Sequence, residues 1–189
     1  MEINSLKNEF KSIFKKFNEL CREVSEKNNL KKQELLQKLI NDFYSYFSNK
    51  GYRIISGENK YTAEKNDFEI SLIFNDDDTF LLEIPQKDVT YSLEIRAGYD
   101  AQKMIFWKHP LTYKAEFLMI NGNVDEFLGE ITDLEVLKKL YQNLHENILH
   151  YEQTLKNYDE VDFVYSFLDS NIEITDFTDI MEKHLQFDQ

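Results

Sequence analysis

The chain has 189 residues, and its 35 Asp and Glu outnumber its 22 Lys and Arg to give a formal net charge of −13. Apolar residues make up 42% of it, including 15 Phe and 11 Tyr, which suffices for a large core and excludes global disorder. We therefore expect one domain that spans residues 1–189. The single cysteine excludes an internal disulfide framework.

The sequence predicts a cytoplasmic protein. Its N-terminus has acidic residues and no apolar core of the length of a signal peptide. No stretch approaches 18 consecutive apolar residues, so neither a transmembrane helix nor another membrane contact is expected.

Residues 1–50 predict an antiparallel pair of helices. Apolar residues recur at spacings of three and four from about residue 3 to residue 27, and again from Leu35 to Phe47. Asn28 and Asn29 interrupt the pattern, and Gly51 is a stop signal after the second helix.

Residues 51–120 predict an antiparallel meander sheet of about five to seven strands. Strict alternation of apolar and polar residues is clearest from Val89 to Ala97. The expected strands span residues 52–56, 60–64, 68–74, 80–84, 89–97, 103–107 and 112–120, with short polar turns between them.

Alternation also predicts the two faces of this sheet. The apolar face carries Phe68, Leu72, Leu82, Tyr91, Leu93, Ile95, Phe106 and Phe117. The polar face carries Glu69, Ser71, Glu83, Thr90, Ser92, Glu94, Arg96, Lys103, Lys114 and Glu116. Ile105 and Trp107 fall on the polar face, which indicates either a contact patch or a site under a loop.

Residues 121–189 predict acidic helices that pack on the sheet, which completes an α+β domain. Thr132 and Glu135 have the spacing of a capping box, and an apolar stripe follows from Leu137 to Leu155. A shorter helix is expected over 161–168 and a final one over 175–187.

No catalytic site, metal site or cofactor is predicted. His145 and His150 are five residues apart, whereas zinc ligands on a helix are three or four apart; an exposed ion pair explains Glu146 and His150. Residues 75–78 lack the Gly and Glu of a calcium loop and predict a solvated turn. Cys21 lies in an apolar stripe and predicts a buried packing residue. There is no glycine-rich phosphate loop.

An enzyme with acids on the sheet is the alternative. A metal-dependent hydrolase or nuclease would use Asp78 or Glu83 together with Glu94. A nuclease pattern of this kind has a lysine two residues after the acid, but Arg96 stands there and cannot act as a base.

The acidic charge is concentrated in the last third of the chain. Residues 1–50 carry a net charge of +3, residues 51–120 carry −4, and residues 121–189 carry −12. A solvated acidic face explains this composition, and so does a surface that engages a basic partner. The residues of that predicted surface are Asp159, Glu160, Asp162, Asp169, Glu173, Asp176, Asp179 and Glu182, with Trp107 as a further contact.

The leading hypothesis is therefore a non-enzymatic acidic binding protein that engages a basic surface of a protein partner. An immunity protein, a phage-type inhibitor and a secretion chaperone all work in this way. Direct nucleic-acid binding is not expected, because Glu residues interleave with the basic residues of the first fifty. A self-associating structural protein, such as a homodimer that joins basic and acidic helices, is the remaining hypothesis.

Overall fold

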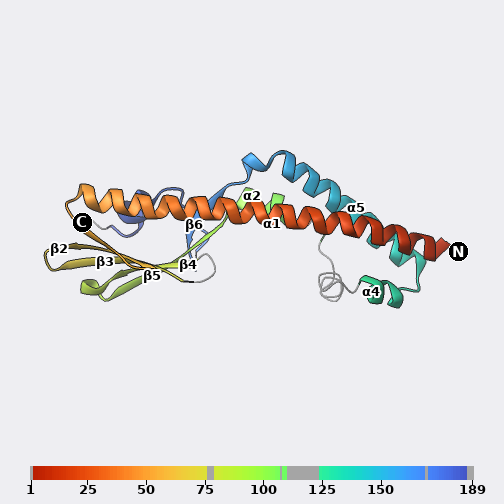
Figure 1. Ribbon diagram of the computed structural model, residues 1–189, viewed down its shortest axis with the longest axis horizontal. Coiled ribbons are helices and arrows are strands. Elements are labelled where there is room, and N and C mark those ends of the chain that lie inside the picture. The colour runs from red at the N-terminus through yellow and green to blue at the C-terminus, as the bar shows by residue number, and fades with distance from the viewer. Residues whose placement is uncertain (1, 76–78, 107, 110–123, 169, 187–189) are drawn as a thin grey trace. The chain divides into compact units, whose positions relative to one another are not determined.

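The computed structural model describes residues 2–75, 79–106, 108–109, 124–168 and 170–186. The chain forms two compact units, each described by itself below. Unit 1 comprises Met1–Lys27 and Tyr99–Val161, and unit 2 comprises Asn28–Gly98 and Asp162–Gln189. The predicted α+β class with an antiparallel meander sheet is confirmed (Figure 1). Among the described residues, no helix is long and apolar enough to cross a membrane.

The predicted pair of N-terminal helices is wrong, because α1 (Glu2–Asn49) is one continuous helix. Val24 and Leu35, which lie on either side of the two asparagines, are eleven residues apart. That separation is about three helical turns, so the apolar stripe stays on one face of the helix. Asparagine costs a helix well under 1 kcal/mol relative to alanine, and two of them do not end it. The predicted stop is confirmed at Gly51, whose φ of 78° is left-handed.

Unit 2 contains a six-stranded antiparallel sheet with the strand order β1-β2-β3-β4-β5-β6. Five strands lie where alternation predicted them, and β6 was predicted as a helix. The strands are β1 (Arg53–Ser56), β2 (Lys60–Lys65), β3 (Phe68–Phe74), β4 (Thr79–Ile84), β5 (Val89–Ala97) and β6 (Phe163–Phe167), with the short 3-10 helix η1 (Pro85–Lys87) before β5.

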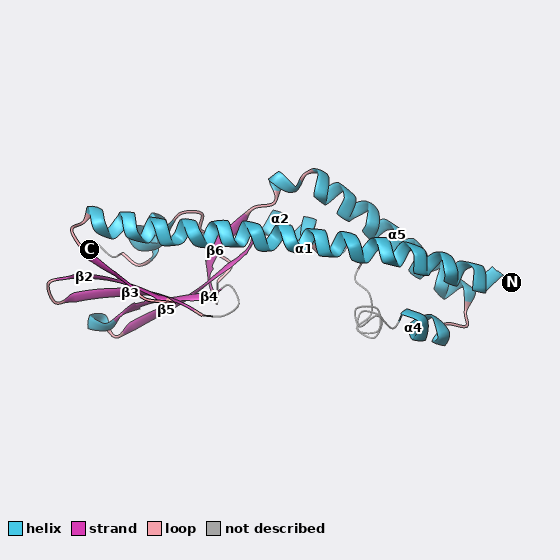
Figure 2. Cartoon of the chain, in the orientation of Figure 1, coloured by secondary structure: helices cyan, strands magenta, loops and turns pink. Residues whose placement is uncertain are grey.

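α1 and the C-terminal segment cover one face of this sheet. No described helix of unit 2 lies on the other face, although Ser71, Val164 and Ser166 are buried there. Residues 28–49 of α1 and the C-terminal segment pack on the covered face, where Phe43, Phe80 and Phe177 are fully buried (Figure 2). The strand register places the alternate residues on the opposite face, called the outer face from here on. The predicted polar residues Glu69, Ser71, Glu83, Thr90, Ser92, Glu94 and Arg96 all lie on the outer face, as expected.

The sequence prediction failed where a strand or helix lacks a clear period. In β6, Tyr165 is buried on the covered face and Val164 is buried on the other side, so the strand has no apolar-polar alternation. Residues 103–107 were predicted as a strand, but α2 (Tyr99–Ile105) is a helix and Phe106 is 62% exposed. The strand predicted over 112–120 lies outside the described residues.

Unit 1 is helical. It consists of the first part of α1 with α2, α4 (Val124–Glu130), α5 (Leu134–Lys156) and the 3-10 helix η2 (Tyr158–Glu160). Its core residues are Phe10, Phe14, Phe17, Val24, Phe127, Leu128, Leu137, Leu144, Ile148 and Tyr151. The capping box predicted at Thr132 is wrong, because Asp133 caps α5 by accepting hydrogen bonds from the backbone N–H groups of Glu135 and Val136.

The helix in the C-terminal segment of unit 2 is shorter than the predicted helix over residues 175–187. α6 (Phe177–Asp179) begins after Asp176 and continues into one π-helical turn, η3 (Ile180–His184). Phe177, Ile180 and Met181 are fully buried in the core against the sheet, so the predicted packing of this segment on the sheet is confirmed.

Candidate functional site

The structure divides the predicted acidic surface between the two units. Asp159 and Glu160 lie in η2 of unit 1, whereas Asp162 and the acids that follow it belong to unit 2. Asp169 and Trp107 are outside the described residues. The predicted residues therefore do not form one surface of one unit.

Three of these acids hold unit 2 together. Asp176 caps α6 by accepting a 2.7 Å hydrogen bond from the backbone N–H of Thr178. Burial raises the pKa of Asp176, but hydrogen bonds from Thr178 and the charge of Lys38 outweigh it and lower the pKa overall. Asp179 pairs with Lys183 at 2.8 Å, and Glu173 lies 3.9 Å from Arg96. These carboxylates have a structural role whether or not a partner binds.

The cations of unit 2 are too few for its carboxylates. Lys38 lies between Asp42, at 2.6 Å, and Asp176, at 3.7 Å. Arg96 lies between Glu94, at 3.4 Å, and Glu173. The sequence of unit 2 has 10 Lys and Arg against 19 Asp and Glu, so it carries −9 of the total −13. Internal ion pairing therefore leaves a large negative charge on this unit.

Exposed side chains that could anchor a partner are aliphatic in unit 2. The aromatic residues among the C-terminal acids belong to the core: Tyr158, Tyr165 and Phe177 are buried, and burial raises the pKa of Tyr158 to about 12. Leu168, which directly follows β6, is instead 51% exposed. The sequence analysis did not single it out as exposed, because it counted Leu168 within a helix.

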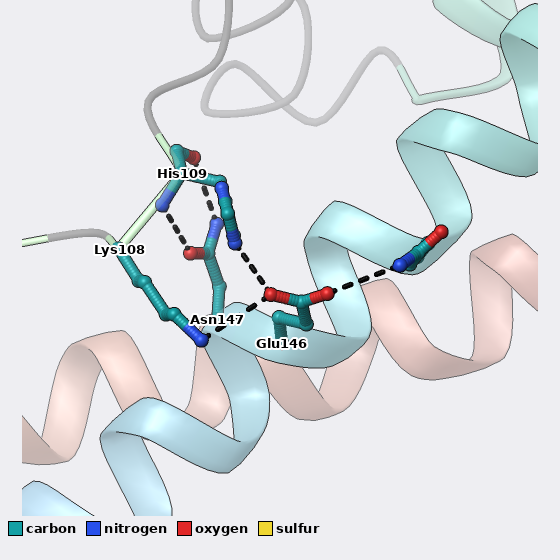
Figure 3. Close-up of polar contacts among 5 residues, drawn as sticks. Lys108, His109, Glu146 and Asn147 are labelled. Carbon is teal, nitrogen blue, oxygen red and sulfur yellow. Dashed lines mark hydrogen bonds and ion pairs between the residues drawn. The ribbon is translucent and has the colours of Figure 1, made fainter.

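A polar cluster in unit 1 joins α5 to residues 108 and 109 (Figure 3). The buried Asn147 side chain accepts a 2.8 Å hydrogen bond from the backbone N–H of His109 and donates a 3.0 Å bond to its carbonyl. One Glu146 oxygen lies 2.6 Å from Nε2 of His109 and 3.3 Å from Nζ of Lys108. We call Glu146 and Asn147 with their two partners the α5 clasp.

The next turns of α5 continue the same pattern. Thr154 and Tyr151 donate hydrogen bonds to the carbonyls of Met104 and Ile105, at 2.7 and 3.1 Å. Nε2 of His150 lies 3.1 Å from the carbonyl of Phe106. Side chains on one face of α5 thus bond to consecutive carbonyls at the C-terminal end of α2. The last carbonyls of a helix have no hydrogen-bond partners within the helix, so these contacts supply them.

The clasp explains the charge state of Glu146. The pKa of Glu146 is lowered to about 2, first by the hydrogen bond with His109, then by those from Gln142 and Lys108. The ion pair predicted between Glu146 and His150 is replaced by these contacts. Every polar group of the clasp bonds to another part of unit 1, so the clasp supports the fold of this unit.

Of the acids proposed for the alternative enzyme, Glu83 and Glu94 do not come together. Glu83 lies opposite Thr90 and Glu94 lies opposite Thr79, so the two are four residues apart along neighbouring strands. That offset is about 13 Å, whereas ligands of one metal ion lie within about 5 Å of each other. Asp78 lies outside the described residues, and those described contain no group of three residues suited to a metal ion. Cys21 is half-buried against the core of unit 1, not fully buried as predicted.

In comparisons with known proteins, no family, curated protein or solved structure matches the chain.

Proposed function

We propose that the protein is a non-enzymatic acidic binding protein of the cytoplasm that engages a basic surface of a protein partner. The observation that supports this proposal is the formal charge of −9 on unit 2. Two of its described cations, Lys38 and Arg96, already pair with two carboxylates each. A basic partner would supply the missing positive charge. An immunity protein, a phage-type inhibitor and a secretion chaperone remain the three settings that fit.

The proposal makes binding sensitive to salt. The Debye length falls from about 10 Å at 0.1 M salt to about 3 Å at 1 M, so exposed carboxylates attract a partner over a shorter range at high salt. Complementary charge mainly raises the association rate and the specificity. Release of the partner by salt is therefore the expected behaviour.

The first test is an affinity pull-down from the native host lysate at low and high salt, with the eluted proteins identified by mass spectrometry. A basic protein that is released by salt supports the proposal and names the setting. If only acidic or neutral proteins bind, or if binding is insensitive to salt, the proposal fails.

Charge-neutralising variants make this test specific. Asp162 and Glu182 are exposed in unit 2, and the double change D162N/E182Q removes two charges while sparing the structural acids. We expect it to weaken binding about two- to thirtyfold, at roughly 0.2–1 kcal/mol for each exposed charge. The change E19Q/E23Q removes two exposed charges from unit 1 and is the matched control. Equal loss of binding in both variants would show a general charge effect and no localised surface.

A further inference from the structure

The outer face of the sheet carries a row of aliphatic side chains among its polar residues. Ile73 of β3 pairs with Leu81 of β4, and Leu81 pairs with Ser92 of β5. The backbone N–H of Leu168 then donates a 3.0 Å hydrogen bond to the carbonyl of Ser92, which continues the row past β6. We call Ile73, Leu81 and Leu168, with the polar Ser92 between the two leucines, the aliphatic row.

The row is accessible on a face that no described helix of unit 2 covers. α1 lies on the opposite face (Figure 2). Leu168 and Ser92 are exposed, and Ile73 and Leu81 are half-buried. An antiparallel sheet often has one solvated face, but such a face normally carries polar side chains. Ile73 and Leu81 are adjacent aliphatic residues on it, and Ser92 separates them from the exposed Leu168. Exposed apolar residues that gather on one surface are typical of a binding surface.

Carboxylates flank the row on both sides. Glu83 lies on one side, two residues from Leu81 along β4, and Glu94 lies on the other side, two residues from Ser92 along β5. Next to Glu94, which lies 3.4 Å from Arg96, Glu173 lies 3.9 Å from the same Arg96. Beyond Glu83, Glu69 is half-exposed and lies 3.9 Å from Lys60. The row therefore has a carboxylate at the margin on each side along the strands, while Lys60 lies opposite Ile73 at its β2 end.

The spacing of these margins fits the width of a helix. The offset of about 13 Å between Glu83 and Glu94, which is too long for a shared metal ion, is close to the diameter of about 10–12 Å of an α-helix with its side chains. The row crosses three strand spacings, about 14 Å, which matches the rise of about ten helical residues. A helix over the row can place aliphatic side chains on it and basic side chains against both margins.

We infer that the aliphatic row, with Glu83 and Glu94 at its margins, is a docking site for an amphipathic helix of the partner protein that has an apolar stripe flanked by Lys or Arg. This inference rests on the proposed function and names the surface that performs it. The partner is chosen by charge: an acidic flank would meet carboxylates on both sides, whereas basic flanks are complementary to them.

The test uses the full chain and three fluorescent helical peptides. One has a leucine stripe with lysine flanks, the second has the same stripe with glutamate flanks, and the third has the composition of the first in scrambled order. We expect saturable binding of the first peptide by fluorescence anisotropy, at least tenfold weaker binding of the other two, and NMR shift changes at Leu81, Ser92 and Leu168. Absence of saturable binding, or shift changes confined to other residues, overturns the inference.

A single substitution distinguishes binding of the peptide at this site from nonspecific electrostatic binding to the acidic chain. Ser92 is exposed in the middle of the row, so S92R places a bulky cation there with little risk to the fold. We expect it to weaken binding of the lysine-flanked peptide at least tenfold. The matched control is S25R, at an exposed position of α1 in unit 1, and we expect it to change the affinity less than twofold.

The outcomes distinguish the two proposals. If the chain still binds basic proteins in a salt-dependent manner while S92R has no effect, the proposed function stands and the docking site is wrong. If neither the peptide nor any basic protein binds, both are wrong. If light scattering shows a dimer that S92R dissociates, the row is an interface between two copies of this chain, which also overturns the inference.

Discussion

The two units of this protein are stabilised in different ways. Unit 2 is built on a continuous ladder of backbone hydrogen bonds and an aromatic core, in which Phe43, Phe47 and Phe177 contact one another. Unit 1 joins α5 to the end of α2 and to His109 through side chains that bond to backbone groups, Asn147 among them. Stability in unit 2 is shared by many equivalent contacts, whereas part of unit 1 depends on single polar residues. Their charges differ too, at −4 for unit 1 and −9 for unit 2.

The largest effect is expected in the core of unit 2. Phe43 is fully buried, so F43A should leave a cavity and cost about 3–5 kcal/mol of unfolding free energy. Hydrogen exchange should accelerate in β2 to β4 more than in α5, because the loss is local to unit 2. F106A is the control: Phe106 is largely exposed in unit 1, and its loss should cost about 0.5 kcal/mol or less. Equal acceleration in both units would show that the chain unfolds as the single domain predicted from its length.

The second-largest loss of unfolding free energy is expected in unit 1. N147A should cost about 2–4 kcal/mol, because it leaves the backbone N–H and carbonyl of His109 without their partner. Chemical denaturation followed by hydrogen exchange would show the loss in α2 and α5. N143A changes a half-buried asparagine one turn earlier in the same helix and should cost far less. A similar cost for both variants would mean that the clasp does not stabilise unit 1.

The smallest effect is expected from the charge of Glu146. Because the pKa of Glu146 falls to about 2 in the folded chain, its ionised form favours folding above the ordinary pKa of 4.5, and this contribution is lost as the pH falls from 4.5 to 2. E146Q should therefore lower the stability of unit 1 at neutral pH and match the unchanged protein near pH 2. Thermal unfolding across this pH range measures the difference. E135Q, at an exposed acid of α5, is the control, and a difference that persists undiminished to pH 2 contradicts the assignment.

The sequence predicted those parts of the fold that depend on local alternation. β3 to β5 follow from apolar residues at every second position, whereas β1 and β2 follow from the hairpin signal at Gly57 to Asn59. β6 could not be predicted, because residues on both of its faces are buried and a short apolar run of this kind also fits a helix. The pair of asparagines in α1 predicted an end of the first helix. The helix continues through them, because the apolar residues before and after them lie on the same face.

The candidate sites depend on information that the sequence does not contain. The polar face of the sheet was predicted residue by residue, but the aliphatic row needs the register that sets Ile73, Leu81 and Ser92 side by side. Side chains of α5, in the clasp and in the turns after it, bond to backbone groups of residues 104–106 and 109, and no pattern of side chains reveals such partners. The acidic residues were identified from composition, yet only the structure shows that Glu173, Asp176 and Asp179 also hold the fold together.

The connection between β5 and β6 has a consequence for how this chain could be shortened. The backbone N–H of Gly98 donates a 3.0 Å hydrogen bond to the carbonyl of Asp162, so the chain leaves the sheet and returns to it at adjacent points. Residues 99–161, which supply all of unit 1 beyond α1, lie between those two points. They amount to an insertion between two neighbouring strands, and a short hairpin turn could span the same gap. A chain that joined Gly98 to Asp162 through such a turn would keep every strand pair of the sheet.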